Sequence, residues 1–329
     1  MSTTTAVDPT ARARDLLGVS RLTNQALTTW LHGLPGVDQV GCEARAAGLG
    51  TRSIKTSSKA WAIDLAISMI DLTTLEGADT PGKVRGLAAR AVTPDPSDLT
   101  TPRPAAVCVY GDMVEIAKEA LGDTGVKVAA VATAFPSGRA SRAVKLADTT
   151  DAVQAGADEI DMVIDRGAFL AGDYLRVFRE IAETKEACGD ARLKVIMETG
   201  ELVTYDNVRR ASWLSMLAGG DFIKTSTGKI SPAATLPVTL VMLEAVRDWQ
   251  GLTGEMVGVK PAGGIRTSKD AIKFLVTVSE VAGEEWLDNT WFRFGASSLL
   301  NDLILQRQKM ATGAYSGADY VADDAPSGY

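Results

Sequence analysis

The chain has 329 residues, of which 46% are hydrophobic and 23% are charged, and its formal net charge is −7. These values predict an ordinary globular protein with one large or two small domains, and the negative charge argues against non-specific nucleic-acid binding. No apolar run approaches the roughly 18 residues of a membrane span, and no secretory signal pattern opens the chain, so we expect no membrane partner and a cytoplasmic location.

Residues 1–57 are predicted to form an N-terminal extension outside the main domain. They contain a polar start, one or two short helices and the Gly/Ser/Thr-rich link GLGTRSIKTSSK. We expect this extension to pack on the main domain or on a neighbouring subunit.

Residues 58–311 alternate between short β-rich apolar runs and segments with helical spacing. The predicted strands are 66–72, 105–110, 127–133, 159–165, 193–199, 221–226, 256–262 and 291–297. Eight such units in about 245 residues match a (βα)₈ TIM barrel, in which function lies at the C-terminal ends of the strands. An open doubly wound sheet is the rival fold, but no GxGxxG follows the first strand and the sequence around GKI does not complete a Walker A motif.

Residues 312–329 combine turn-forming residues, acids and tyrosines without any periodicity. They are predicted to be a flexible C-terminal tail.

Charged residues fall at inward positions of the predicted strands. Side chains alternate along a strand, so EIDMVID places Asp161 inside the barrel, and the same alternation turns Lys194, Lys224 and Lys260 inward. Gly258, two residues before Lys260, leaves room for a long side chain. Buried charges are costly unless they are paired, so one acid and three lysines at this end of the barrel require an explanation.

One explanation is structural: an ion-pair network, for example Asp161 with Lys194, that only holds the barrel together. This explanation fits Lys224 and Lys260 less well, because lysines on adjacent strands repel each other. At about 5 Å and an effective dielectric constant near 20, the repulsion is about 3 kcal/mol, or roughly two pKa units. Burial lowers a lysine pKa further, and a neutral amine is what Schiff-base formation with a carbonyl requires.

Histidine and cysteine usage excludes several other mechanisms. The only histidine, His32, lies in the N-terminal extension, and Cys42, Cys108 and Cys188 are far apart with no CxxC pair. Metal sites built on several histidines, Ser-His-Asp triads and disulfide frameworks are therefore not expected.

Two glycine-containing turns predict a phosphate site. KPAGGIR places Gly263 and Gly264 after the seventh strand, with a helix starting near Thr267 or Ser268, and RFGASS follows the eighth strand. In TIM barrels these two loops commonly bind phosphate through backbone N–H groups and a helix N-terminus.

With these motifs the chain resembles deoxyribose-phosphate aldolase, a family of class I (Schiff-base) TIM-barrel aldolases. The matching segments run from about residue 60 to 311: IDLTTL, AAVCVY, GADEIDMVID, LKVIMETGEL, DFIKTSTGK, VGVKPAGGIRT and FRFGASSLL. The resemblance implies reversible cleavage of 2-deoxy-D-ribose 5-phosphate to D-glyceraldehyde 3-phosphate and acetaldehyde, with no metal or cofactor. It also implies a homo-oligomer, either a dimer or a tetramer.

The resemblance also implies roles for individual residues. Lys224 would form the Schiff base, Lys260 would lower its pKa, and Asp161 would relay protons with Lys194 beside it. Positions that match the substrate and phosphate pocket are Thr227, Lys229, Gly263, Gly264, Arg266, Gly295, Ser297 and Ser298. Positions that match the floor or rim, where packing is an equal alternative, are Asp71, Thr73 and Cys108.

The chain also departs from the family pattern. Ala134 stands where some bacterial relatives have asparagine, and Gly111 replaces a frequent proline, which affects only the expected loop shapes. Tyr329 is the last residue, and some members of the family end in a tyrosine that assists proton transfer. Tyr329 could take the same role in the proton relay, or it could belong to a disordered end. Two further functions are also open: a transaldolase-like Schiff-base enzyme and a non-catalytic sugar-phosphate sensor.

Overall fold

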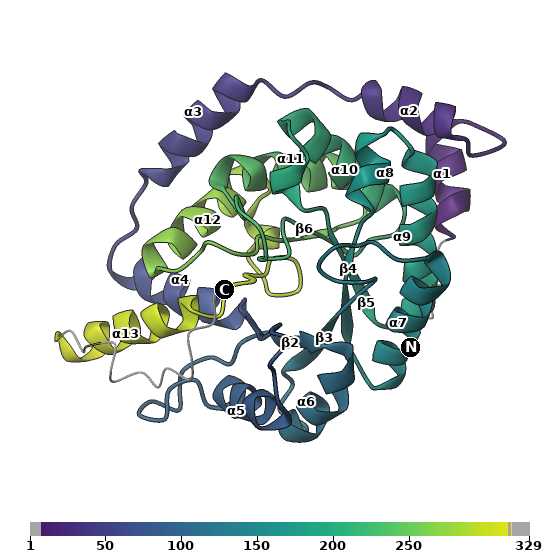
Figure 1. The fold of residues 1–329 in the computed structure, drawn as a ribbon. Helices are drawn as coiled ribbons and strands as arrows, with labels where there is room; N and C mark the ends of the chain where they lie inside the picture. The colour runs from purple at the N-terminus through teal and green to yellow at the C-terminus, as the bar shows by residue number, and fades with distance from the viewer. Residues whose placement is uncertain (1–7, 315–316, 318–329) are drawn as a thin grey trace.

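The computed structural model describes residues 8–314 and residue 317. Tyr329 and most of the predicted tail therefore lie outside the described residues. The centre is a sheet of seven parallel strands that neighbour one another in chain order (Figure 1). The strands are β1 (Asp71–Thr73), β2 (Ala106–Tyr110), β3 (Lys127–Ala132), β4 (Glu159–Val163), β5 (Arg192–Ile196), β6 (Phe222–Lys224) and β7 (Gly258–Lys260).

Residues 292–295 close the sheet into a barrel without forming a continuous eighth strand. Phe292 forms an isolated parallel bridge to Val259 of β7, and Phe294 forms one to Ile70, just before β1. The prediction of a regular strand over 291–297 is therefore wrong, although its position between the seventh and first strands is right. The (βα)₈ arrangement is confirmed as an α/β TIM-barrel-like fold.

Helices surround the sheet, as the alternating pattern predicts (Figure 1). Those that follow β1 are α5 (Pro81–Val92), α6 (Val114–Leu121), α7 (Arg142–Gln154), α8 (Arg166–Leu170), α9 (Tyr174–Cys188), α10 (Tyr205–Leu217), α11 (Leu236–Thr253), α12 (Ser268–Val281) and α13 (Leu299–Thr312). Three short 3₁₀ turns join them: η1 (Gly111–Met113), η2 (Thr199–Glu201) and η3 (Glu284–Trp286).

Local sequence signals set where these helices begin. Thr204, Thr235 and Thr267 cap α10, α11 and α12, each accepting a hydrogen bond from a backbone N–H in the first helical turn. Such caps satisfy donors that the helix leaves unpaired. The predicted helix start near Thr267 or Ser268 is thus confirmed.

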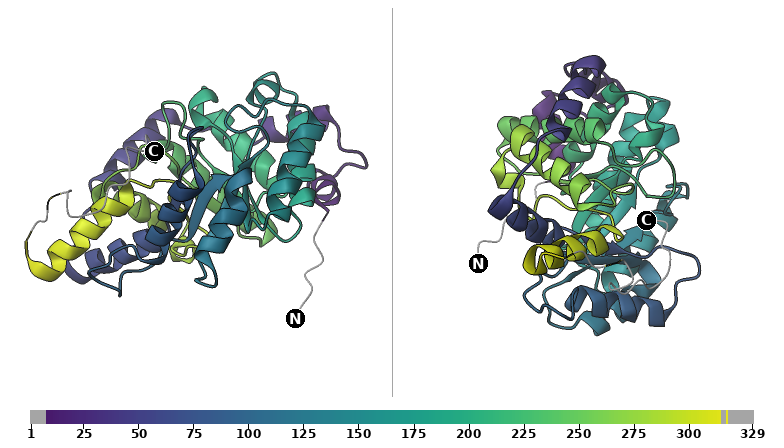
Figure 2. Two further views of the ribbon diagram at one scale, coloured as in Figure 1. Left: turned by 60° about the horizontal axis from the view of Figure 1, so that its bottom comes forward. Right: turned by 90° about the vertical axis from the view of Figure 1, so that its left-hand side faces the viewer.

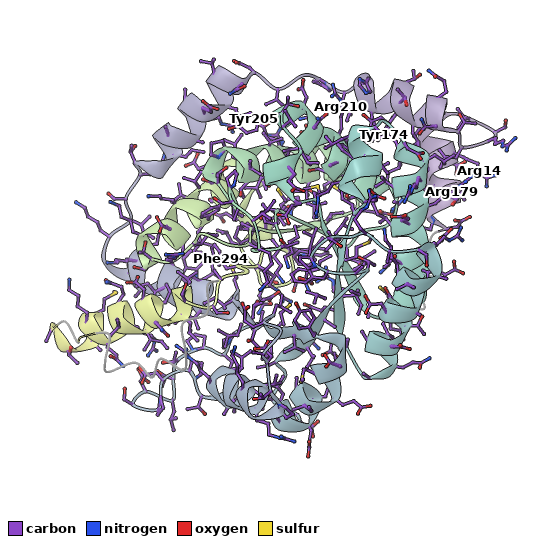
Figure 3. The ribbon with its side chains drawn as sticks, viewed as in Figure 1. Arg14, Tyr174, Arg179, Tyr205, Arg210 and Phe294 are labelled. Carbon is purple, nitrogen blue, oxygen red and sulfur yellow. The ribbon has the colours of Figure 1, made fainter. Side chains whose placement is uncertain are left out.

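The N-terminal extension forms helices α1 (Pro9–Leu17), α2 (Asn24–His32) and α3 (Gln39–Gly50), which arch over the outer face of the helical layer (Figure 1). Helix α3 packs on α11 and α12, and α2 packs on α9 and α10. His32 contacts the hydroxyl of Tyr174 at 3.1 Å, and Tyr174 is labelled in Figure 3 at the start of α9. The extension is therefore part of the packed outer layer of its own chain.

The first predicted strand, 66–72, is largely wrong. Helix α4 (Thr56–Ser68) continues through its first half, and β1 begins only at Asp71. The run is apolar without alternation, and such a run fits a buried helix as well as a strand. Helix α4 buries Ile63, Ala66 and Ile67, and it lies beside α13 in both views of Figure 2.

No helix among residues 8–314 is both long enough and apolar enough to cross a membrane.

Candidate active site

Asp161 lies at the centre of a buried group of charged side chains. Its Oδ2 atom accepts hydrogen bonds from Lys224 Nζ at 2.7 Å and from Lys260 Nζ at 2.8 Å. Its Oδ1 atom accepts one from Lys194 Nζ at 3.0 Å. The four residues predicted to meet inside the barrel therefore do so, through one shared carboxylate.

The strand register explains this convergence. Asp161 of β4 pairs with Lys194 of β5, and Lys224 of β6 pairs with Lys260 of β7. Paired residues of neighbouring strands direct their side chains to the same face of the sheet. Lys224 and Lys260 are the last residues of their strands, so the group lies at the C-terminal end of the barrel.

Three further charged residues surround the first four. Arg293 donates to Asp71 Oδ1 at 2.7 Å and to Glu159 Oε1 at 2.9 Å. Glu159 also pairs with Lys194, and Asp71 Oδ2 lies 2.5 Å from Lys260 Nζ. Sequence reasoning missed Glu159 and Arg293, although Glu159 shares a strand face with Asp161. We call these residues, listed in full as Asp71, Glu159, Asp161, Lys194, Lys224, Lys260 and Arg293, the charged cluster.

The charged cluster contains four basic side chains and three carboxylates, all nearly inaccessible to solvent. If every group were ionised, the cluster would carry one uncompensated positive charge in surroundings where charge is costly. One neutral basic side chain would balance it.

Lys224 is the lysine of the cluster whose pKa is lowered, so its charged form is the least favoured of the three. Burial lowers the pKa of Lys224, Lys260 lowers it further, and Asp161 opposes both only in part. Burial also disfavours the charged form of Lys260, but Asp161 and Asp71 outweigh it and raise the pKa of Lys260. Burial opposes ionisation of Asp161 too, yet the three lysines hold its pKa well below the usual value.

An uncharged surface borders the charged cluster. Leu75, Cys108, Ala129 and Val131 pack together, and we call these four residues the apolar patch. Val131 of β3 pairs with Asp161, and Ala129 pairs with Glu159. Burial, followed by the charge of Asp161, raises the pKa of the Cys108 thiol to about 11. The apolar patch therefore supplies no charge to the cluster at neutral pH.

Gly258 makes room for an aromatic ring instead of a long charged side chain. A Cβ atom at Gly258 would lie 2.3 Å from a ring carbon of Phe222, which fills this space. Lys194 Nζ and Arg293 Cζ each lie 5.9 Å from the centre of the Phe222 ring.

The two predicted phosphate turns lie side by side. Gly263 donates its N–H to Gly295 O at 3.0 Å, and Ala262 forms a parallel bridge with Gly295. Both Gly263 (φ 77°) and Gly264 (φ 82°) adopt backbone angles that favour glycine. Arg266 is exposed just beyond this turn, before the N-terminus of α12.

Other predicted pocket residues have defined partners. Ser297 Oγ accepts from Thr73 N at 2.6 Å and donates to Thr73 O at 3.0 Å, which ties the last turn to β1. Ser298 is the residue before α13. Lys229 Nζ pairs with Glu76 Oε1 at 3.0 Å, so it reaches from the loop after β6 to the loop after β1.

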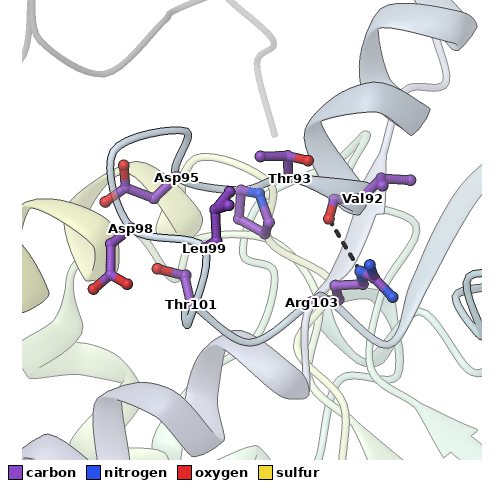
Figure 4. Close-up of a pocket in the computed structure, with 8 residues that line it drawn as sticks. Val92, Thr93, Asp95, Asp98, Leu99, Thr101 and Arg103 are labelled. Carbon is purple, nitrogen blue, oxygen red and sulfur yellow. Dashed lines mark hydrogen bonds between the residues drawn. The ribbon is translucent and has the colours of Figure 1, made fainter.

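The described part of the chain offers no group of three or more His, Cys, Asp or Glu residues placed to hold a metal ion. A separate pocket of about 500 Å³ lies in the connection between α5 and β2, where Asp95, Asp98 and Arg103 are among its lining residues (Figure 4). That connection leads into the N-terminal end of β2, so this pocket opens at the opposite end of the barrel from Lys224 and Lys260.

Comparison with known sequences agrees with this geometry. The family described as DeoC/LacD family aldolase matches residues 65–304. The deoxyribose-phosphate aldolase of Mus musculus is 45% identical over 278 residues, which cover 80% of this chain and 86% of the mouse protein. The Homo sapiens deoxyribose-phosphate aldolase is 44% identical with the same coverage of each chain.

Solved structures share the architecture. An aldolase named QR15 is 28% identical, with a TM-score of 0.59, and the match covers 75% of this chain and 97% of that one. Deoxyribose phosphate aldolase from Aeropyrum pernix has a TM-score of 0.56 at 22% identity, covering 79% of this chain and 100% of that one, and shows the shared fold. On the family match and the close relatives together, this chain belongs to the DeoC/LacD family of aldolases.

Proposed function

We propose that the protein catalyses reversible aldol cleavage of 2-deoxy-D-ribose 5-phosphate to D-glyceraldehyde 3-phosphate and acetaldehyde, through a Schiff base on Lys224. The observation that carries the mechanism is the shared Oδ2 atom of Asp161, which contacts both Lys224 and Lys260. This contact places a lysine with a lowered pKa beside a lysine that keeps its proton.

The first stage forms the covalent bond. Neutral Lys224 Nζ attacks the C1 aldehyde of the open-chain sugar, and loss of water from the resulting carbinolamine leaves an iminium ion. Asp161 is ionised at rest, accepts a proton from the Lys224 side of the reaction and passes it through water to the departing hydroxyl, while Lys194 holds the other oxygen of its carboxylate.

The second stage breaks the carbon–carbon bond. Removal of the C3 hydroxyl proton sends the C2–C3 electron pair into the iminium, which releases glyceraldehyde 3-phosphate and leaves an enamine on Lys224. Protonation of the enamine at C2 and hydrolysis of the new iminium release acetaldehyde and restore the amine.

The paired turns at Gly263–Gly264 and Gly295–Ser298 are the proposed phosphate site. Backbone N–H groups in these turns favour a dianion, whereas at the start of α12 the N–H groups of Ser268 and Asp270 already donate to Asp302 and Thr267. Arg266 and Lys229 add positive charge at the rim. The ion pair between Lys229 and Glu76 would exchange for substrate phosphate on binding.

A homo-oligomer in the cytoplasm is part of this proposal. The Aeropyrum pernix enzyme is described as tetrameric. Light scattering on the purified chain distinguishes a dimer or a tetramer from a monomer.

Borohydride trapping tests the proposed function. Reduction in the presence of acetaldehyde is expected to attach a two-carbon group to Lys224. Peptide mass spectrometry identifies the labelled lysine. Labelling at another lysine, or none, would contradict the mechanism. Comparing cleavage of deoxyribose 5-phosphate with that of fructose 6-phosphate tests the substrate, since faster cleavage of the ketose would favour a transaldolase-like enzyme.

A further inference from the structure

Glu198 is a buried carboxylate beside the proposed active site that the chemistry above does not use. It follows β5 by two residues and is only 1% exposed. Its backbone has φ 54° and ψ 61°, a left-handed conformation that non-glycine residues seldom adopt. An unfavourable backbone at a buried acid indicates that the position of this side chain is fixed by its contacts.

The hydrogen-bond partner of Glu198 is Thr227, three residues after Lys224, and the Arg166 guanidinium lies 4.0 Å from Glu198 Oε2. The backbone N–H of Thr227 donates to both carboxylate oxygens, at 3.2 and 3.3 Å, and the Thr227 hydroxyl donates to Oε2 at 2.5 Å. The same hydroxyl accepts the N–H of Lys229 at 3.2 Å. The Thr227 proton is therefore committed to Glu198 and is not free to bind substrate.

These bonds fix a loop that is held on both sides. Toward β5, Met197 and Thr199 donate their N–H groups to the carbonyl oxygens of Lys224 and Thr225. Toward β7, the Thr225 hydroxyl accepts the N–H of Ala262 at 2.9 Å. Beyond Thr225, Glu198 holds both the backbone N–H and the hydroxyl of Thr227, while Glu76 pairs with the Lys229 side chain.

The held segment forms one wall of the proposed phosphate site. A Cβ atom at Gly263 would lie 3.4 Å from the Cα of Gly228 and 2.8 Å from the Cβ of Ala233, so Gly228 lies beside the first glycine turn. A small shift of this segment would move both Lys229 and the surface against Gly263. The bond-forming amine of Lys224 is held separately by Asp161.

We propose that Glu198 is a positioning residue that fixes residues 227–229, and through them sets the affinity for the phosphate end of the substrate. The inference rests on the proposed function, because it assigns this wall to phosphate. The inference assigns two properties of the site to different residues. The reactivity of Lys224 depends on the charged cluster, and the affinity for phosphate depends on Glu198.

The test compares Glu198→Gln with Glu201→Gln. Glu201 ends the 3₁₀ turn that follows Glu198, pairs closely with Arg166, is 44% exposed and has no hydrogen bond to Thr227 among the described contacts. For Glu198→Gln we expect KM for deoxyribose 5-phosphate to rise about tenfold, with little change in kcat. Cleavage of unphosphorylated 2-deoxyribose and acetaldehyde trapping on Lys224 should stay at the wild-type level, and Glu201→Gln should match wild type throughout.

An equal loss on both sugars, or an unchanged KM for the phosphate ester, would overturn the inference. Wild-type protein is assayed first on deoxyribose 5-phosphate. If the wild-type protein fails to cleave that sugar, the proposed function is wrong. If the wild-type protein cleaves it and Glu198→Gln leaves KM unchanged, only the role of Glu198 is wrong.

A second pair of variants covers the case in which Glu198→Gln does not fold. Thr227→Val removes the hydroxyl that Glu198 holds, and Thr227→Ser keeps it. The inference predicts a raised KM for Thr227→Val and rescue by Thr227→Ser. Where Glu198→Gln folds, adding it to Thr227→Val should raise KM no further. Fully additive effects, or no rescue by serine, would contradict action through Thr227.

Discussion

The charged cluster and the apolar patch occupy neighbouring strands of one barrel interior, and both are shielded from water. Asp161 and Glu159 pair in register with Val131 and Ala129, yet only one side contains ionisable groups that are charged at neutral pH. Because the apolar patch offers no counter-charge, the cluster must balance its own charges. The comparison explains why the pKa of Lys224 is lowered although a carboxylate lies 2.7 Å away.

Asp161→Asn removes the central carboxylate of the charged cluster and has the largest expected effect. It leaves Lys194 and Lys260 with fewer counter-charges, and we expect the free energy of unfolding at pH 7 to fall by about 3–5 kcal/mol. Denaturant unfolding measures this change. Asp248→Asn, which removes an exposed partner of Arg247, is the control and should change stability by less than about 1 kcal/mol.

The same variant has a pH signature. The pKa of folded Asp161 is lowered, so its stabilising contribution is present above the unfolded value of 3.8 and is lost as pH falls through the folded pKa. The stabilities of wild type and Asp161→Asn should therefore converge in acid. A constant difference down to the lowest pH at which the protein stays folded would show that the carboxylate charge is not the cause.

Lys260→Met tests the charge balance from the cationic side. With one cation fewer, the remaining basic groups match the three carboxylates, so Lys224 would retain its proton and its pKa would rise. We expect acetaldehyde trapping on Lys224 at pH 7 to slow by at least about tenfold, which corresponds to one pKa unit, and to recover at high pH. A uniform loss at every pH would point to a role other than lowering the pKa.

Cys108→Asp places an acid in the apolar patch, so that the patch as well as the cluster contains a group that is charged at neutral pH. The new carboxylate would stabilise protonated Lys224, and trapping at pH 7 should slow by about tenfold. Cys108→Ser adds no charge and is the matched control, expected to react within about threefold of wild type. Equal slowing in both variants would show that packing at this position matters more than charge.

Ala134→Asn concerns the backbone after β3 and has the smallest expected effect. Ala134 has φ 61°, which asparagine tolerates better than alanine. We expect a gain of about 0.5–1 kcal/mol in the free energy of unfolding, with trapping on Lys224 unchanged. Thermal or denaturant unfolding measures the gain, and a loss of stability would show that the turn has no strain to relieve.

Much of the fold and the centre of the site could be predicted from the sequence. Strand alternation was enough to turn Asp161, Lys194, Lys224 and Lys260 toward one another, because their strands are short and regular. It could not separate helix from strand in residues 66–72, where every position except Ser68 is buried. It also could not foresee that residues 292–295 bridge two strands without forming a regular ladder.

The partners in the site were harder to predict than its members. That Asp161 would contact all three lysines depends on side-chain reach across three strands, which spacing alone does not define. Glu198 leaves no periodic signal, because its carboxylate is directed to Thr227 by a left-handed backbone after the strand has ended. Such a turn is visible only once the loop is folded.

The central claim is that Lys224 is the neutral member of the charged cluster. Its most direct test is the rate of reductive trapping of Lys224 by acetaldehyde and borohydride-type reductant, measured against pH in the wild-type protein. We predict that the rate rises with an apparent pKa below 10.5, the ordinary lysine value. An apparent pKa at or above 10.5 would contradict the account.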